Sequence, residues 1–152
     1  MEAVVFVGLQ GAGKSSFYRE RFADTHLRLS LDMLKTRHRE RLLMRACVEA
    51  KQRFVVDNTN PTRAERRAYI EAARAAGFRV VGYYFRSRAE DCLRRNEGRP
   101  EGRRVPAKGV LGTAGRMELP SPDEGFDELN YVWIDEKGGF VVEGWRDADR
   151  RA

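Results

Sequence analysis

The chain has 152 residues and a formal net charge of +6, and 41% of its residues are hydrophobic. This length suffices for one domain with a sizeable core and is too short for two ordinary domains, and the composition argues against wholesale disorder. No apolar run approaches the roughly 18 residues that cross a membrane, and the N-terminus lacks the long apolar stretch of a signal peptide. We therefore expect a single cytoplasmic domain over residues 1–152, with no membrane partner.

Basic residues outnumber acidic ones, 29 to 23, and most of the basic residues are arginine. Arginine binds phosphate in a bidentate manner and stacks on bases, so this balance suits a polyanionic partner. A general preference for arginine on solvated faces would give the same composition. Cys47 and Cys92 lie far apart and form no CxxC pair, which predicts buried free thiols rather than a disulfide or a zinc site.

An apolar run over residues 3–7 predicts the first strand, and a helix is predicted over residues 14–22. Between them, GLQGAGKSS matches the phosphate-loop pattern G-x-x-x-x-G-K-[ST]. The residues expected to bind a nucleotide here are Gly8, Gly11, Gly13, Lys14, Ser15 and Ser16. An ordinary glycine-rich turn is the alternative, but the flanking strand and helix favour the phosphate loop.

The residue types of this loop suit a polyphosphate. Glycines let successive backbone N–H groups point at the anion without a Cβ in the way. The following helix presents the positive end of its dipole to the same anion. We expect Lys14 to reach the β- and γ-phosphates of ATP and the Ser15 hydroxyl to bind Mg²⁺.

The rest of the chain alternates between strand and helix patterns. Further strands are predicted at residues 27–31, 54–56, 79–85, 131–134 and 140–142. Further helices are predicted at residues 33–52, at 61–77 with Asn60 as a cap, and at 88–97. This alternation indicates an α/β fold, a parallel sheet with helices on both faces, and the last two strands predict a hairpin at its edge. The basic stretch over residues 98–122 is predicted to be loop-rich and mobile.

Polar residues follow the second and third predicted strands, where ligands bind in such sheets. Asp32 follows the second strand, and it could cap a helix or accept the proton of an attacking hydroxyl. Asp57 follows the third strand, in the usual place of a residue that orients Mg²⁺, although a turn would also use an aspartate there. Asn58 comes next and could simply build the turn.

Four segments, GLQGAGKSSF, SLDML, VVDNTNPTRAERRAYIEAARAAGF and CLRRNEGRP, resemble the 5′-hydroxyl polynucleotide kinase family. The segments VPAKGVL and ELPSPDEGFDELNYVWI extend the similarity over nearly the whole chain. The resemblance implies an α/β P-loop kinase fold with a mainly parallel five-stranded sheet of order 2-3-1-4-5, a C-terminal hairpin and an arginine-bearing lid over about residues 94–122. It also implies that ATP, with Mg²⁺, phosphorylates the 5′-OH end of DNA or RNA, and the chain shows no phosphatase or ligase segment.

The resemblance assigns roles to individual residues. Asp32 would be the general base, and Lys35 and Asn58 would contact the acceptor. Arg95 and Arg99 would be lid arginines that bind the ATP phosphates, with Arg99 stabilising the transition state, although a solvated helix end is the alternative. Lys35 departs from the family's phage member, which has an arginine there, so the grip on the acceptor phosphate could be looser. Further candidates for that grip are Arg37, Arg39, Arg103 and Arg104.

Two other functions fit the same motifs. A small-molecule kinase acting on a nucleoside, sugar or antibiotic hydroxyl would share the loop, the aspartate and the lid arginines. A nucleotide-binding regulator without catalysis would need the loop but would have no use for Asp32 opposite Lys14. No adenine-reading motif is visible, so the sequence predicts neither the preferred nucleoside triphosphate nor the oligomeric state.

Overall fold

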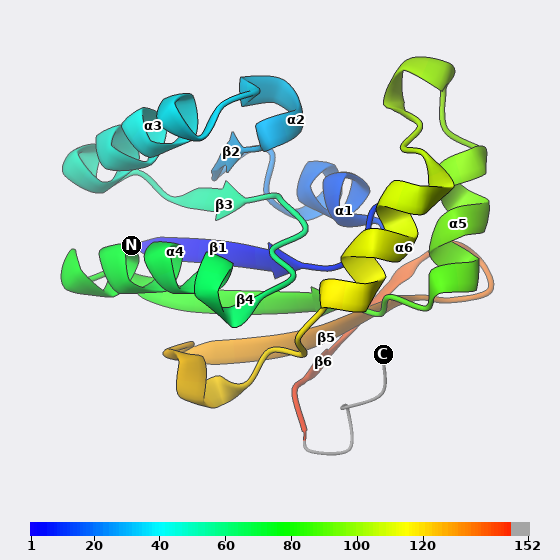
Figure 1. The fold of residues 1–152 in the computed structure, drawn as a ribbon. Coiled ribbons are helices and arrows are strands. Elements are labelled where there is room, and N and C mark those ends of the chain that lie inside the picture. The colour runs from blue at the N-terminus through cyan, green and yellow to red at the C-terminus, as the bar shows by residue number, and fades with distance from the viewer. Residues whose placement is uncertain (147–152) are drawn as a thin grey trace.

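The computed structural model describes residues 1–146, which form one mixed sheet between two layers of helices (Figure 1). The predicted domain ran to residue 152, and residues 147–152 lie outside the described part. The strands are β1 (Glu2–Val7), β2 (Leu27–Leu29), β3 (Phe54–Val56), β4 (Arg79–Phe85), β5 (Glu128–Ile134) and β6 (Phe140–Gly144). The α-helices are α1 (Lys14–Arg21), α2 (Leu31–Leu34), α3 (Arg37–Ala50), α4 (Arg63–Ala75), α5 (Ala89–Glu97) and α6 (Ala107–Arg116). Two 3₁₀ turns, η1 (Glu101–Arg103) and η2 (Pro122–Glu124), complete the described elements.

The sheet has the order β2-β3-β1-β4-β5-β6. All neighbouring strands pair in parallel except β5 and β6, which form the predicted antiparallel hairpin, with Ile134 opposite Phe140. The predicted α/β fold and the order 2-3-1-4-5 are confirmed for the first five strands. The residue pattern predicted six strands, as observed, whereas the five-stranded sheet implied by the resemblance is one strand short, because β6 of the hairpin pairs with β5 and belongs to the same sheet.

Alternation along β1 assigns the two faces of the sheet. Ala3 and Val5 belong to a buried cluster with side chains of α3 and α4. Val4 and Phe6 belong to a second cluster with side chains of α1, α5 and α6. Because successive side chains of a strand point to opposite faces, both faces of the sheet are covered, as the sequence predicted.

The helix predicted over residues 33–52 is divided in the structure. The chain leaves the helical conformation at Lys35, where φ is 72°, and α3 begins after Thr36. The Thr36 side chain accepts a hydrogen bond from the Arg39 backbone N–H at 3.1 Å. A threonine that caps a new helix competes with continuation of the old one, which explains the break.

The N-cap of α4 also differs from the prediction. The cap is Thr62 rather than Asn60, and Thr62 forms a capping box with Glu65. Asn60 is buried instead, and its side-chain amide donates to the Phe6 carbonyl oxygen at 2.7 Å. The predicted end of the helix is confirmed, since Gly77 follows α4 with φ at 81°. Asn60 therefore ties the end of β3 to β1, next to the phosphate loop.

Residues 98–122 are not as loop-rich as predicted, because they contain α6. The glycines of α6 have low helix propensity, so its sequence does not predict a helix. The helix is stabilised by tertiary packing instead: Val110 is fully buried, and Thr113 is nearly so.

A buried ion pair fixes the segment that follows α6. Arg66 of α4 binds both carboxylate oxygens of Glu124, at 2.8 and 3.1 Å. Its third contact is the Asn60 carbonyl oxygen, at 2.8 Å. Arg66 thus joins η2 to the end of β3, beside the candidate site.

Cys47 and Cys92 are buried free thiols, as predicted. Among the described residues, no helix is both long and apolar enough to span a membrane.

Candidate active site

The loop between β1 and α1 has the conformation that its glycines predict. Gly11 and Gly13 have φ of 83° and 100°, in the left-handed region. A Cβ on Gly11 would lie 2.4 Å from the Cys92 carbonyl oxygen of α5, so a larger residue would push the loop and this helix apart. The Gly8 N–H donates to the Thr59 carbonyl oxygen at 3.0 Å, which fixes the start of the loop against the segment after β3. The close approach of Cys92 and the hydrogen bond to Thr59 were not predicted from the sequence.

Lys14 lies beneath this loop and is 9% exposed. Its Nζ donates to the carbonyl oxygens of Gly8 and Leu9 at 2.9 and 2.7 Å. Burial lowers the pKa of Lys14 to about 8, and the nearby negative charge of Asp57 acts in the opposite direction. Asp32 and Arg99 are also close enough to influence this pKa. The structure therefore gathers Lys14, Asp57, Asp32 and Arg99 at the same edge of the sheet.

The low pKa of Lys14 predicts pH-dependent nucleotide binding. A polyphosphate favours protonated Lys14, so bound nucleotide raises the pKa above its value of about 8 in the free protein. At higher pH, free Lys14 is neutral and binding must take up a proton. We expect the affinity for ADP to fall by up to about tenfold per pH unit above about pH 8, measured by calorimetry in two buffers of different ionisation enthalpy.

Lys14→Met is the control for this effect. It should bind ADP weakly and without the additional pH dependence, because the titrating amine is gone. An affinity of the wild-type protein that stays constant from about pH 7 to about pH 9.5 would contradict the assignment of Lys14 as a phosphate ligand.

Ser15 and Asp57, the predicted magnesium ligands, are adjacent. The Ser15 hydroxyl donates to Asp57 Oδ2 at 3.1 Å, and the Asp57 side chain is 2% exposed. A hydroxyl and a carboxylate are hard oxygen donors that suit Mg²⁺. Within residues 1–146, no group of three or more His, Cys, Asp or Glu side chains could hold a metal ion alone. The donor set therefore fits an ion shared with nucleotide phosphates, as is usual for Mg²⁺.

Arg28 of β2 contacts both Ser15 and Asp57, and it was not predicted from the sequence to belong to the site. Its Nε donates to Asp57 Oδ2 at 2.8 Å, and its Nη2 donates to Ser15 Oγ at 2.9 Å. The alternating pattern LRLSL placed Arg28 in a strand, but which groups that strand faces depends on how β2 pairs with β3. Ser16 points elsewhere: it is exposed and accepts from Arg19 Nη2 at 3.3 Å.

Asp32 is exposed and lies in α2, one turn after β2 ends. It is not the N-cap, which is Ser30. The segment after β3 fixes the start of α2, because Asn58 Oδ1 accepts a hydrogen bond from the Leu31 N–H at 2.9 Å. Asn58 Nδ2 donates to Glu40 Oε2 at 2.7 Å, so both ends of this amide bind protein groups. In this structure Asn58 therefore positions the helix that carries Asp32, and its contact with an acceptor stays a prediction.

The buried carboxylate of Glu40 completes this support. Glu40 is 2% exposed, and its Oε1 accepts from the Tyr69 hydroxyl at 2.6 Å. Arg37 Nη1 donates to the same hydroxyl oxygen at 2.6 Å. Burial and the Glu40 charge both raise the pKa of Tyr69, so the phenol stays protonated. Neither Glu40 nor Tyr69 was singled out from the sequence, because their contact joins α3 to α4.

Exposed basic residues follow Asp32. Lys35 is exposed at the end of α2, and its φ of 72° is a conformation that residues other than glycine seldom adopt. Arg39 is also exposed, and its Nη1 donates to the Leu34 carbonyl oxygen at 3.1 Å. Arg103 and Arg104 are exposed on the lid segment. Lys35, Arg39, Arg103 and Arg104 are thus exposed where an acceptor could reach them.

The lid segment contacts the phosphate loop. Arg95 Nη1 donates to the Gly11 carbonyl oxygen at 3.3 Å, and Arg99 is half-buried. Gln10 Nε2 donates to Thr113 Oγ1 of α6 at 3.1 Å, a contact that the sequence did not predict. The lid therefore rests on the loop from two helices, α5 and α6.

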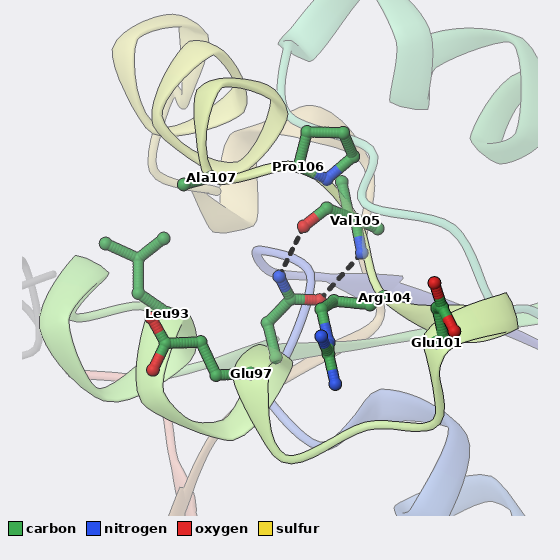
Figure 2. A pocket seen from close by; sticks show the side chains of 8 residues that line it. Leu93, Glu97, Glu101, Arg104, Val105, Pro106 and Ala107 are labelled. Carbon is green, nitrogen blue, oxygen red and sulfur yellow. Dashed lines mark hydrogen bonds between the residues drawn. The ribbon is translucent and has the colours of Figure 1, made fainter.

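A cavity of about 410 Å³ lies within the lid, between the end of α5 and the start of α6. Figure 2 shows the residues that line it. The Asn96 amide bridges both sides through hydrogen bonds to the Val105 backbone. The charged residues that line the cavity are Glu97, Glu101 and Arg104. None of the residues predicted to act in catalysis lines it, so it is separate from the Lys14–Asp32 site.

Comparison with curated proteins gives several sequence relatives, one of which is similar over most of this chain. A polynucleotide phosphatase/kinase of Schizosaccharomyces pombe, described as bifunctional, is 27% identical over 138 residues, 86% of this chain. The chain spans 33% of the length of that relative.

Solved structures share the fold. Chaetomium thermophilum Kti12, solved in complex with ADP-AlF3, has a TM-score of 0.62 at 17% identity, covering 90% of this chain and 92% of that one. A gluconokinase from Sinorhizobium meliloti 1021 has a TM-score of 0.59 at 18% identity, covering 86% of this chain and 82% of that one. At these identities the likeness establishes a P-loop kinase fold, which agrees with the sheet order and the phosphate loop.

The AAA_33 family model, described as an AAA domain, matches residues 4–120, from β1 through the lid. The matched range includes the phosphate loop, Asp32, Asp57 and both lid arginines. The chain belongs to this family, and it is a nucleotide-binding domain with a P-loop kinase fold.

Proposed function

We propose that this chain transfers the γ-phosphate of ATP to the 5′-hydroxyl end of a polynucleotide. The observation that carries the proposal is the arrangement around the phosphate loop: buried Lys14 is held by the loop carbonyl oxygens, and neighbouring Ser15 binds Asp57. Asp32 and Arg99 lie near enough to Lys14 to influence its pKa. A phosphate ligand, a metal ligand, a base and a lid arginine are the parts that phosphoryl transfer requires. A regulator that only binds nucleotide would not need the base and the lid arginine beside the lysine.

In the proposed reaction, Asp32 accepts the proton of the 5′-hydroxyl group as its oxygen attacks the γ-phosphorus. The bond between the γ-phosphorus and the bridging β–γ oxygen breaks, and ADP leaves. Lys14 and the loop N–H groups bind the phosphates, and Arg95 and Arg99 approach from the lid to neutralise the charge of the transferring group. Mg²⁺, held by Ser15 and Asp57 together with the nucleotide, would neutralise the β- and γ-phosphates.

A polynucleotide acceptor is supported by two features. The relative from Schizosaccharomyces pombe, whose description includes polynucleotide kinase, is similar over 86% of this chain. Lys35 and Arg39 are exposed shortly after Asp32, where they can bind the phosphates of an acceptor strand. A small-molecule kinase is the second candidate, favoured by Lys35 itself, because a lysine lacks the bidentate grip of arginine on a phosphate.

The test is transfer of labelled γ-phosphate to a panel of acceptors: 5′-OH DNA, 5′-OH RNA, nucleosides, sugars and 5′-phosphorylated DNA. We expect label on the 5′-OH oligonucleotides, and none on the 5′-phosphorylated oligonucleotide, which lacks the acceptor hydroxyl. Label on a nucleoside or sugar alone would support the small-molecule kinase. Nucleotide binding without label on any acceptor would support the regulator.

A further inference from the structure

Arg28 and the two expected magnesium ligands form a closed triangle of hydrogen bonds. The guanidinium donates to Asp57 Oδ2 at 2.8 Å and to Ser15 Oγ at 2.9 Å. The Ser15 hydroxyl in turn donates to Asp57 Oδ2 at 3.1 Å. Arg28 is therefore bound to the same two oxygens that would receive a divalent ion, and its positive charge already neutralises the buried Asp57 carboxylate.

A guanidinium and Mg²⁺ are poorly compatible at this place. Mg²⁺ binds oxygen at about 2.1 Å and requires near-octahedral geometry, so an ion on Ser15 Oγ would lie within a few ångströms of the guanidinium. At this short range, in a partly buried site, the repulsion between a divalent ion and a fixed positive charge is strong. The two cations therefore compete for Ser15 and Asp57.

The surroundings of Arg28 leave space for its side chain to move away from Ser15 and Asp57. β2 is the edge strand of the sheet, and the Arg28 side chain is 25% exposed. Its guanidinium carbon lies 5.9 Å from the centre of the Tyr18 ring, and the Tyr18 hydroxyl is fixed by a hydrogen bond to the His26 carbonyl oxygen. An aromatic face is a favourable surface for a guanidinium. Arg28 can thus withdraw toward Tyr18 and solvent without crossing the core.

We propose that Arg28 occupies the magnesium site of the free protein as a built-in cation, so that a divalent ion enters only together with a nucleotide, as Arg28 withdraws. The phosphates supply the additional negative charge and ligands that shift the balance from the guanidinium to the ion. Arg28 is then a positioning residue: it holds Ser15 and Asp57 together before the nucleotide arrives. The inference rests on the proposed metal role of Ser15 and Asp57 and is independent of the acceptor.

The test measures binding of Mn²⁺ alone by electron paramagnetic resonance, without nucleotide, to the wild-type protein and to Arg28→Gln. We expect Arg28→Gln to bind Mn²⁺ at least about tenfold more tightly, because the competing charge is removed. Arg28→Lys keeps a positive charge and should remain close to wild type. Arg79→Gln is the charge-matched control. Arg79, at the start of β4, pairs with exposed Glu128 at the start of β5, and its substitution should leave Mn²⁺ affinity unchanged.

Equal Mn²⁺ affinity in the wild-type protein and Arg28→Gln would overturn the inference. A second measurement covers the case in which Arg28→Gln fails to fold. The Arg28 Nε–H resonance of the wild-type protein should change on addition of Mg²⁺ with ADP and not with Mg²⁺ alone, and an unchanged resonance in both cases would also overturn the inference. If the wild-type protein binds no Mn²⁺ even with ADP, the metal role of Ser15 and Asp57 in the proposed function is itself wrong.

Discussion

The Asp32→Asn variant is expected to fold and to bind ATP, yet to lose phosphate transfer by about 10²–10⁴-fold. Asn has nearly the same size as Asp, and Asp32 is exposed in α2, so the substitution opens no cavity. ATP contacts in the proposed mechanism run through the phosphate loop and Lys14, so nucleotide affinity should persist. The variant lacks only the carboxylate that accepts the proton of the hydroxyl group.

Two measurements on the same preparation separate these effects. A thermal-shift titration with ATP reports folding and nucleotide binding, and a single-turnover assay with a 5′-OH oligonucleotide reports transfer. Asp24→Asn is the matched control, because Asp24 is exposed in the turn between α1 and β2, and it should react at the wild-type rate. A folded Asp32→Asn protein that transfers phosphate at the wild-type rate would remove Asp32 from the mechanism.

The Arg99→Ala variant is expected to lower kcat by about 10³-fold, the effect typical of arginines that stabilise the transition state of phosphoryl transfer. Arg99 follows α5, is half-buried and lies close enough to Lys14 to lower its pKa. This position brings its positive charge toward the phosphates that Lys14 is proposed to bind. Arg99→Lys should restore only part of the rate, because a lysine cannot form the bidentate contact.

Arg94→Ala is the matched control for Arg99. Arg94 belongs to the same arginine-rich helix end, but its side chain is 73% exposed and pairs with Asp91. We expect its kcat to stay within about twofold of wild type, since exposed ion pairs contribute little. If steady-state kinetics gave similar losses for Arg94→Ala and Arg99→Ala, the effect would arise from the charge of the lid as a whole.

The sequence predicts the phosphate loop and the sheet well, because both depend on local patterns. Glycine spacing, a following helix and short apolar strands determine β1, the loop and α1 without distant contacts. The predicted helix over 33–52 failed at Lys35 and Thr36, where a capping side chain outweighed the helical pattern. Helix α6 was missed because its glycines have low helix propensity, and burial of Val110 and Thr113 compensates for this.

The parts of the site that the sequence did not predict depend on contacts between distant elements. Glu40, Tyr69 and Asn58 form one hydrogen-bonded group only because α3 and α4 lie on the same face of the sheet beside the end of β3. Arg28 reaches Asp57 only because β2 pairs with β3, with Leu29 opposite Val56. Single-strand patterns carry no information about such partners, so these supporting residues require the structure.

The most direct test of the central claim is a competition in one reaction between a 5′-OH oligonucleotide and its free 5′-terminal nucleoside, with limiting labelled ATP. We expect nearly all label on the oligonucleotide, because the exposed Lys35 and Arg39 can bind its phosphates. Its kcat/KM should fall with salt with a log–log slope of roughly −2, as for about three contacted phosphates of a single strand. Equal labelling of nucleoside and oligonucleotide, with no effect of salt, would contradict a polynucleotide acceptor.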